Sequence, residues 1–255
     1  MPSDQVLLTE HIDSVCVLTL NRPDKLNSFS MELLQALNVA LSRALDDDGT
    51  RAIVITGAGP KAFAAGNDIT RLASMDNMQA YRDMVTGQRL LLQLHESPKP
   101  TIAMVNGYAL GGGFELALAC DFIVASSNAM FGFPEIGLNT MPGWGGTQLA
   151  VLKLGLTKAK EMVLSGARYP VDECHRLGLV SRVCTPETLR AETLSFAAQF
   201  TKHHPFAVAM SKRALSRASE LPLAAGLDFE AASYAANFAT PHARASLNAF
   251  IHRKK

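Results

Sequence analysis

The chain has 255 residues, of which 48% are hydrophobic and 18% are charged, and its formal net charge is +1. It therefore lacks the basic excess on which most nucleic-acid-binding domains depend. Its four cysteines lie far apart with no CxxC pair, which argues against a zinc site and a disulfide framework. The most apolar segment, 101–125, is too polar and too rich in glycine to span a bilayer. We expect a cytoplasmic protein with a large core and a sizeable subunit interface.

The first half of the chain alternates between strand patterns and helix patterns. Residues 15–20 form a short β-branched run that ends at the turn Asn21-Arg22-Pro23. Ser30 is a suitable N-cap for a helix whose leucines recur at helical spacing up to the segment 46–49. Further strands are predicted at 52–56, 101–105 and 122–125, and a helix is predicted at 78–95.

Beyond about residue 143 the pattern is mostly helical. Helices are predicted near 146–154, 157–164, 186–201, 205–217, 222–238 and 242–252. A short extra helix is predicted to begin at Asp172, before the apolar segment 179–183. The predicted fold is an α/β core over residues 1–195, followed by a C-terminal helical region over residues 196–255.

Three consecutive glycines, 111–113, separate a predicted strand from a helix-like apolar run. Glycines allow the backbone to approach a ligand closely. A helix that begins there directs free N–H groups at the loop, and such groups can stabilise a developing oxyanion. The alternative is a tight turn where a helix and a strand pack closely. A second loop of small residues, 62–69, follows another strand; there Asp68 could simply cap a helix.

Two glutamates lie in apolar surroundings. Glu115 follows the glycines directly, and Glu135 stands between Pro134 and Ile136. Burial and mutual repulsion separate the pKa values of such a pair, so that one carboxyl group accepts a proton and the other donates one. The alternative is that each makes a structural hydrogen bond or salt bridge, because spacing in the sequence does not show that the two converge.

Seven stretches occur in a specific order and spacing over nearly the whole chain. They are Asn21-Arg22-Pro23 with Asn27, residues 63–69, residues 106–113, Glu115 with Cys120-Asp121, Pro134-Glu135-Ile136, residues 142–148, and Gly178-Leu179-Val180. Together they resemble the crotonase superfamily, the enoyl-CoA hydratases and isomerases. The resemblance implies a spiral of ββα units with a C-terminal helical region that assembles trimers, commonly paired into hexamers. It also implies an acyl-CoA thioester substrate and a place in fatty acid β-oxidation.

By position, the main-chain N–H groups of Asn67 and Gly112 correspond to the oxyanion hole of the family. Glu115 and Glu135 match the carboxylate pair of its hydratases. The resemblance implies that Glu115 deprotonates the attacking water, while Glu135 delivers a proton to Cα of the substrate. The product is a 3-hydroxyacyl-CoA, and the reaction needs no metal and no redox cofactor.

The resemblance also implies which residues contact the substrate. The implied contacts are Lys25, Leu26, Ala65, Asp68 and Ile69 with CoA, Gly143 with the water, and Phe250 and Arg253 with the CoA of a neighbouring subunit. The chain departs from the family pattern at several positions. Asn67 stands where alanine is commoner, Phe114 and Trp144 are bulkier than usual and are expected to narrow the site, and Ala245-Ser246 replaces a common Glu-Gly pair.

Two other functions stay open from the sequence. A Δ3,Δ2-enoyl-CoA isomerase of the same family generally needs only the position of Glu135, whereas this chain retains both glutamates. A non-enzymatic RNA-binding or CoA-binding module is the other alternative. RNA binding would call for a lysine-rich helix, and the sequence has none.

Overall fold

Two β-sheets form the body of the computed structural model, which describes residues 5–253 except for the side chain of Arg253. The larger sheet has the order β1 (Leu7–Ile12), β2 (Val15–Leu20), β3 (Ala52–Gly57), β5 (Thr101–Val105), β7 (Phe122–Ser126) and β10 (Arg182–Cys184). The smaller sheet has the order β4 (Ala62–Ala64), β6 (Tyr108–Leu110), β8 (Met130–Gly132) and β9 (Arg168–Pro170). β1 and β9 pair antiparallel with their neighbours, and the other pairs are parallel.

Successive strands enter the two sheets alternately. β3, β5 and β7 belong to the larger sheet, and each is followed by a short strand of the smaller sheet, β4, β6 or β8. Helical segments follow each pair before the chain returns to the larger sheet. The expected spiral of ββα units is therefore confirmed.

The helices of the body have the following bounds: α1 Met31–Asp46, α2 Ile69–Ala73, α3 Asn77–His95, α4 Gly112–Ala119, α5 Gly146–Leu154, α6 Leu156–Ser165, α7 Val171–Arg176 and α8 Leu189–Thr201. Two 3-10 turns, η1 (Pro23–Lys25) and η2 (Pro134–Leu138), lie between strands and helices. As expected, the Ser30 hydroxyl accepts a hydrogen bond from the Leu33 N–H and caps α1. All residues of α4 are buried, because it packs against α3, α5 and both sheets.

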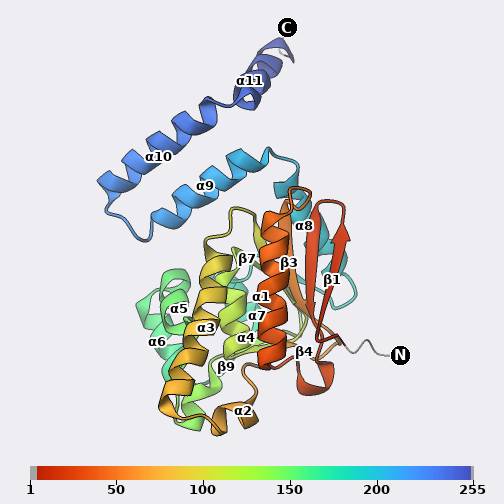
Figure 1. The fold of residues 1–255 in the computed structure, drawn as a ribbon, viewed down its shortest axis with the longest axis vertical. Coiled ribbons are helices and arrows are strands. Elements are labelled where there is room, and N and C mark those ends of the chain that lie inside the picture. The colour runs from red at the N-terminus through yellow and green to blue at the C-terminus, as the bar shows by residue number, and fades with distance from the viewer. Residues whose placement is uncertain (1–4, 254–255) are drawn as a thin grey trace.

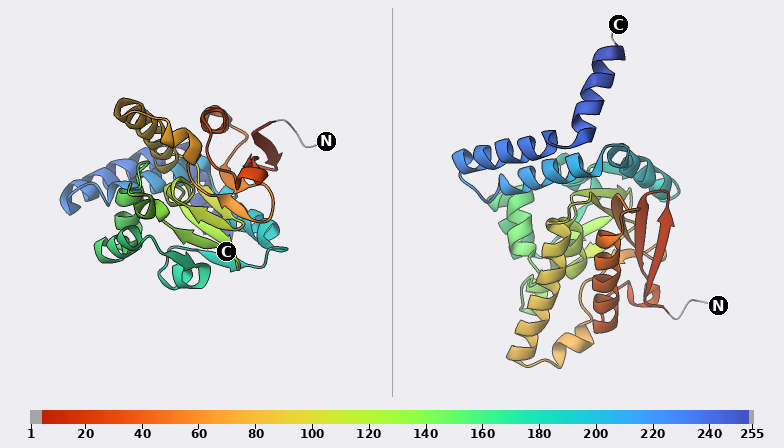
Figure 2. Two further views of the ribbon diagram at one scale, coloured as in Figure 1. Left: turned by 90° about the horizontal axis from the view of Figure 1, so that it is seen from below. Right: turned by 45° about the horizontal axis from the view of Figure 1, so that its top comes forward.

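The last three helices, α9 (Pro205–Arg217), α10 (Leu223–Phe238) and α11 (Pro241–Arg253), lie at one end of the molecule. α10 runs alongside α9, and α11 projects away from the body (Figure 1, Figure 2). The division expected at residues 195 and 196 falls inside α8, whose Ala197 packs on the larger sheet. Within the described residues, none of the helices combines the length and hydropathy needed to cross a membrane.

The predicted helices agree with the structure to within about three residues at their ends, but several strands were not predicted from the sequence. These are β1, β10 and the short strands of the smaller sheet, β4, β6, β8 and β9. A three-residue strand shows no alternation that a sequence pattern could reveal, and its identity depends on the partner strand beside it.

The Asn27 side chain joins the loop around η1 to the connection between β3 and β4. Its side chain is fully buried and accepts a hydrogen bond from the Arg22 N–H (2.9 Å). The same side chain donates to the carbonyl oxygens of Ala58 (3.0 Å) and Ala62 (2.8 Å). Asn27 thus fixes the loop around η1 against the connection between β3 and β4.

Replacement of Asn27 by alanine should lower the free energy of unfolding by about 2 kcal/mol, because the Arg22 N–H and the Ala58 carbonyl oxygen lose their partner. The Ala62 carbonyl oxygen keeps a longer hydrogen bond from Nδ2 of Asn106 (3.2 Å). Urea denaturation measures this change. Asn139→Ala is the matched control, since Asn139 has a similar positive φ (55° against 56°) but an exposed side chain. Equal losses in the two variants would contradict the role given to the hydrogen bonds.

Candidate active site

Two loops meet at the N-terminus of α4. Gly66 has a φ of 90°, and a Cβ atom placed on it would lie 3.4 Å from the Gly112 nitrogen. From the other side, a Cβ atom on Gly112 would lie 3.7 Å from Nδ2 of Asn67. The small residues of both loops therefore allow the main chains at 66–67 and 111–112 to lie against each other.

Two main-chain N–H groups at this junction have no acceptor within the described part of the chain. The neighbours of Asn67 are tied to Phe29: the Phe29 N–H donates to Gly66 O (2.9 Å), and the Asp68 N–H donates to Phe29 O (3.2 Å). The Asn67 N–H between them makes no hydrogen bond. The Gly112 N–H is the first of α4 and lies outside the helical hydrogen-bond pattern. Both groups are available to an acceptor from a ligand.

Glu115 lies in the first turn of α4 and is 1% exposed. Its Oε1 accepts hydrogen bonds from the N–H groups of Trp144 (2.8 Å) and Gly146 (2.7 Å). Burial raises the pKa of the carboxyl group, and these main-chain hydrogen bonds oppose the rise because they favour the charged form. The loop before α5 therefore holds the Glu115 carboxylate in one position.

Glu135 approaches the same place from η2. A Cβ atom placed on Gly111 would lie 2.8 Å from Oε1 of Glu135, and Gly111 has a φ of 52°, so only glycine fits there. Oε2 of Glu135 is buried and has no hydrogen-bond partner among the described residues. Burial, reinforced by the charge of Glu115, raises the pKa of Glu135 to about 7.

The two glutamates thus lie at one site in different environments. One accepts two main-chain hydrogen bonds, whereas an oxygen of the other is buried and unpartnered. Repulsion between two close carboxylates disfavours the doubly ionised state, so the pair retains a proton near neutral pH. The arrangement can accept a proton at one carboxyl group and donate one from the other, beside two free N–H donors.

The sequence model of the enoyl-CoA hydratase/isomerase family matches residues 10–255. The chain is 35% identical over 249 residues to the short-chain-enoyl-CoA hydratase of Clostridium acetobutylicum, a match that covers 98% of this chain and 95% of that protein. It is 39% identical to a probable enoyl-CoA hydratase of Rhizobium meliloti, with 99% and 97% covered. The chain belongs to the enoyl-CoA hydratase/isomerase family.

Solved structures of the family share the fold. The crystal structure of an enoyl-CoA hydratase from Bacillus anthracis superposes with a TM-score of 0.94 at 34% identity, and the match covers 98% of this chain and 97% of that one. The crotonase fold and the family predicted from the motifs are therefore confirmed.

The residues expected to contact CoA lie on two adjoining segments. Lys25 ends η1 and is exposed, and the carbonyl oxygen of Leu26 accepts a hydrogen bond from the Ala65 N–H (3.0 Å). Asp68 caps α2 through the Thr70 N–H. The remaining expected contact on these segments, Ile69, is 61% exposed. The structure brings this set together beside the Asn67 loop. Asp68 also caps a helix, which is the alternative role that the sequence suggested for it.

The other expected contacts lie elsewhere. Gly143 packs on α3, where its carbonyl oxygen accepts a hydrogen bond from Nε2 of Gln88 (2.8 Å). Phe250 lies on α11, which projects away from the body, and is 60% exposed. The side chain of Arg253 lies outside the described part of the chain. Within this one chain, α11 therefore does not approach the glutamates, and its role stays a prediction.

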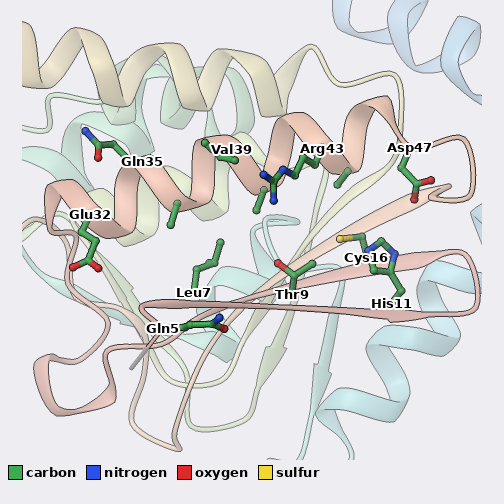
Figure 3. Close-up of a pocket in the computed structure, with 13 residues that line it drawn as sticks. Gln5, Leu7, Thr9, His11, Cys16, Glu32, Gln35, Val39, Arg43 and Asp47 are labelled. Carbon is green, nitrogen blue, oxygen red and sulfur yellow. The ribbon is translucent and has the colours of Figure 1, made fainter. Parts of the chain in front are cut away.

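A groove between β1 and α1 includes none of the expected site residues (Figure 3). His11 and Cys16 are cross-strand neighbours at one end of it. Burial and the nearby charge of Asp47 raise the pKa of the Cys16 thiol to about 11. The thiol is therefore protonated at neutral pH, and the pair is not an activated nucleophile.

Two contributions to the site were not predicted from the sequence. Gly146 donates a main-chain hydrogen bond to Glu115, and Gly111 provides the space that the Glu135 carboxyl group occupies. The glycines themselves were visible in the motifs 111–113 and 145–146. Their roles were not, because a main-chain hydrogen bond leaves no trace in the identity of the donor residue.

The raised pKa of Glu135 predicts a pH-dependent gain in stability when its charge is removed. At pH 4 the carboxyl group is mostly protonated in both folded and unfolded states, whereas at pH 8 the folded protein holds a partly buried carboxylate at a cost. Glu135→Gln should therefore raise Tm by roughly 5 °C at pH 8 and change it little at pH 4.

Differential scanning calorimetry at both pH values measures this difference. Glu96→Gln, at the exposed C-cap of α3, is the control for the substitution itself, and the gain in Tm should be specific to Glu135→Gln. If Glu135→Gln had a lower Tm than the unaltered protein at pH 8, the folded protein would stabilise the Glu135 carboxylate, which would contradict a raised pKa.

Proposed function

We propose that this protein is a 2-enoyl-CoA hydratase, which adds water reversibly across the Cα=Cβ bond of a thioester to give a 3-hydroxyacyl-CoA. The observation that carries the proposal is the pair of glutamates at one site with unequal surroundings, Glu115 buried and Glu135 partly buried. Glu115 accepts two main-chain hydrogen bonds, whereas Oε2 of Glu135 accepts none from residues 5–253. The hydratase names of full-length relatives support the same conclusion.

The unequal surroundings assign the two roles. The N–H groups of Trp144 and Gly146 favour the ionised form of Glu115, so this residue serves as the base toward water. Glu135, with a pKa raised to about 7, keeps its proton in much of the population near neutral pH and serves as the acid. A pair that shares one proton is the form that reacts.

In the hydration step, Glu115 takes a proton from water while the water oxygen forms a bond to Cβ of the substrate. The electron pair of the Cα=Cβ bond moves toward the thioester carbonyl, and Cα takes the proton of Glu135. The N–H groups of Asn67 and Gly112, which have no acceptor among the described residues, would stabilise the negative charge on the carbonyl oxygen. The reverse sequence removes water from the 3-hydroxyacyl-CoA.

The proposed CoA contacts are Lys25, Leu26, Ala65, Asp68 and Ile69, and Gly143 would help to place the water. We propose that no cofactor is required other than the CoA of the substrate, because the two carboxyl groups supply both proton transfers. A cytoplasmic location and a place in fatty acid β-oxidation stay predictions. The cysteines, which are free and mostly buried, are compatible with a reducing compartment.

We further propose that the C-terminal helices assemble trimers, singly or paired as hexamers. No residue of α9 or α10 is buried in the single chain. Large apolar side chains are exposed on the three helices, among them Leu215, Leu223, Leu227, Tyr234 and Phe250. Exposed apolar surface of this extent marks an interaction site. In such an assembly the projecting α11 could carry Phe250 and Arg253 to the CoA of a neighbouring subunit (Figure 2).

The hydratase is favoured over the alternatives by the position of Glu115. An isomerase that moves a proton between Cα and Cγ needs only Glu135, and it would leave the fixed Glu115 carboxylate without a role. An RNA-binding module would need a positive surface, which a net charge of +1 does not favour. A catalytically silent CoA-binding module would not need two carboxyl groups at one site.

The role of Glu115 predicts that Glu115→Gln lowers kcat for hydration of crotonyl-CoA by at least about 10²-fold. Glutamine keeps an oxygen for the two main-chain N–H groups but cannot take a proton from water. Loss of absorbance of the enoyl thioester measures the rate. Isomerisation of a 3-enoyl-CoA, if the protein catalyses it, should survive this change and disappear in Glu135→Gln.

Intact hydration in Glu115→Gln would refute the assignment of the base. Failure of the unaltered protein to hydrate enoyl-CoA esters from four to sixteen carbons would refute the hydratase itself.

The oxyanion role of Gly112 predicts a loss of about 10²–10³-fold in kcat for Gly112→Pro, which lacks the N–H. Proline is tolerated at the first residue of a helix, where that N–H makes no helical hydrogen bond. Gly112→Ala is the matched control because it keeps the N–H, and its Cβ would meet nothing nearer than 3.5 Å. Equal activities of the two variants, with circular dichroism showing both folded, would exclude this N–H from the reaction.

A further inference from the structure

Trp144 fills the space beside the proposed oxyanion hole. It is 1% exposed and lies in the loop between η2 and α5. Its Cε3 atom would be 3.5 Å from a Cβ atom placed on Gly112. Its ring centroid is 4.9 Å from that of Phe29. The indole is therefore in contact with the turn whose N–H group would bind the thioester oxygen.

The indole cannot move back toward α3. A Cβ atom placed on Gly87 of α3 would lie 2.3 Å from Cδ2 and Cε2 of Trp144. The ring is thus pressed against the main chain of Gly87, and no larger residue fits behind it. With Phe29 on another side, the position of the ring is set by close packing, and the space it occupies is closed to a substrate.

The main chain of the same residue positions the proposed base. The Trp144 N–H donates to Oε1 of Glu115. The residue that carries the indole is therefore hydrogen-bonded to the carboxylate that would activate water. The proposed CoA contacts lie on another pair of loops, which the hydrogen bond from the Ala65 N–H to the Leu26 carbonyl oxygen joins. An acyl chain that enters from that loop and places its carbonyl at Gly112 would point its far end toward the indole.

We propose that Trp144 ends the acyl pocket and restricts the enzyme to short 2-enoyl-CoA thioesters of about four carbons. The inference rests on the proposed hydratase function and adds the substrate class of the same site. With the thioester carbonyl at Gly112, carbons beyond Cγ would meet the indole, and the packing against Gly87 leaves the ring no room to withdraw toward α3. In a pocket of fixed size, one extra methylene group on the substrate lowers kcat/KM by about 10-fold or more.

The first test compares kcat/KM for the four-, six-, eight- and ten-carbon 2-enoyl-CoA esters. The unaltered protein should show a decline of at least about 10-fold from four to eight carbons, and Trp144→Ala should raise the eight-to-four ratio by at least about 10-fold. Both variants at this position, Trp144→Ala and Trp144→Phe, keep the main-chain N–H that binds Glu115. Trp144→Phe, a smaller truncation that is easier to fold, should shift the ratio in the same direction by less.

A flat length profile in the unaltered protein would overturn the proposal, and so would an unchanged ratio in folded variants. Calorimetric titration with butyryl-CoA and octanoyl-CoA measures how acyl length affects affinity without catalysis. If no ester is hydrated but butyryl-CoA still binds at least about 10-fold more tightly, the hydratase function fails while the pocket assignment stands. Equal affinities would refute the pocket assignment.

The packing of the ring on α3 has its own test. Gly87→Ala should force the indole into the pocket and lower kcat/KM for crotonyl-CoA, because its Cβ cannot coexist with the present ring position. In the Trp144→Ala background, Gly87→Ala should change kcat/KM for crotonyl-CoA little. Additive effects of the two changes would show that Gly87 does not act through the indole.

Trp144 is the sole tryptophan of the chain, so its fluorescence reports directly on this contact. Butyryl-CoA should change the emission on binding, and CoA without an acyl group should not. Identical spectra with butyryl-CoA and CoA, at concentrations that saturate the protein, would place the acyl group away from the indole and overturn the proposal.

Discussion

The site depends on the hydrogen bonds that Oε1 of Glu115 accepts from the main chain of the loop before α5. An unpaired carboxylate at 1% exposure would be costly, and the N–H groups of Trp144 and Gly146 reduce that cost by favouring the charged form. The same two bonds fix the loop on α4, so that the base, the indole and the start of α5 occupy set positions. A single constraint thus links the electrostatics of the site to its shape.

Much of the polar surface of the site comes from the main chain. The free N–H groups of Asn67 and Gly112, and the donors to Glu115, belong to residues whose side chains do not take part in these bonds. Glycine at 111 has a second function, since a side chain there would occupy the place of the Glu135 carboxyl group. Small residues are therefore concentrated where two loops and a helix N-terminus must come within contact distance.

The parts of the fold that were predicted have strong local signals. α1 carries a serine N-cap and leucines at helical spacing, and β3, β5 and β7 are short apolar runs bounded by turns. The smaller sheet was not predicted because β4, β6, β8 and β9 have three residues each. Such strands form only when the spiral of the larger sheet places them side by side, and this is a property of the tertiary structure.

The sequence by itself determined the family, the two glutamates in apolar surroundings and the glycine-rich turn, because each depends on residue types in a recognisable order. Only the tertiary structure decided that Glu115 and Glu135 share one site, and that they differ in hydrogen bonding. It alone placed the indole of Trp144 between Gly87 and Gly112. These facts depend on segments far apart in the chain, whose contacts arise from packing and from main-chain groups that every residue carries, so residue identity does not encode them.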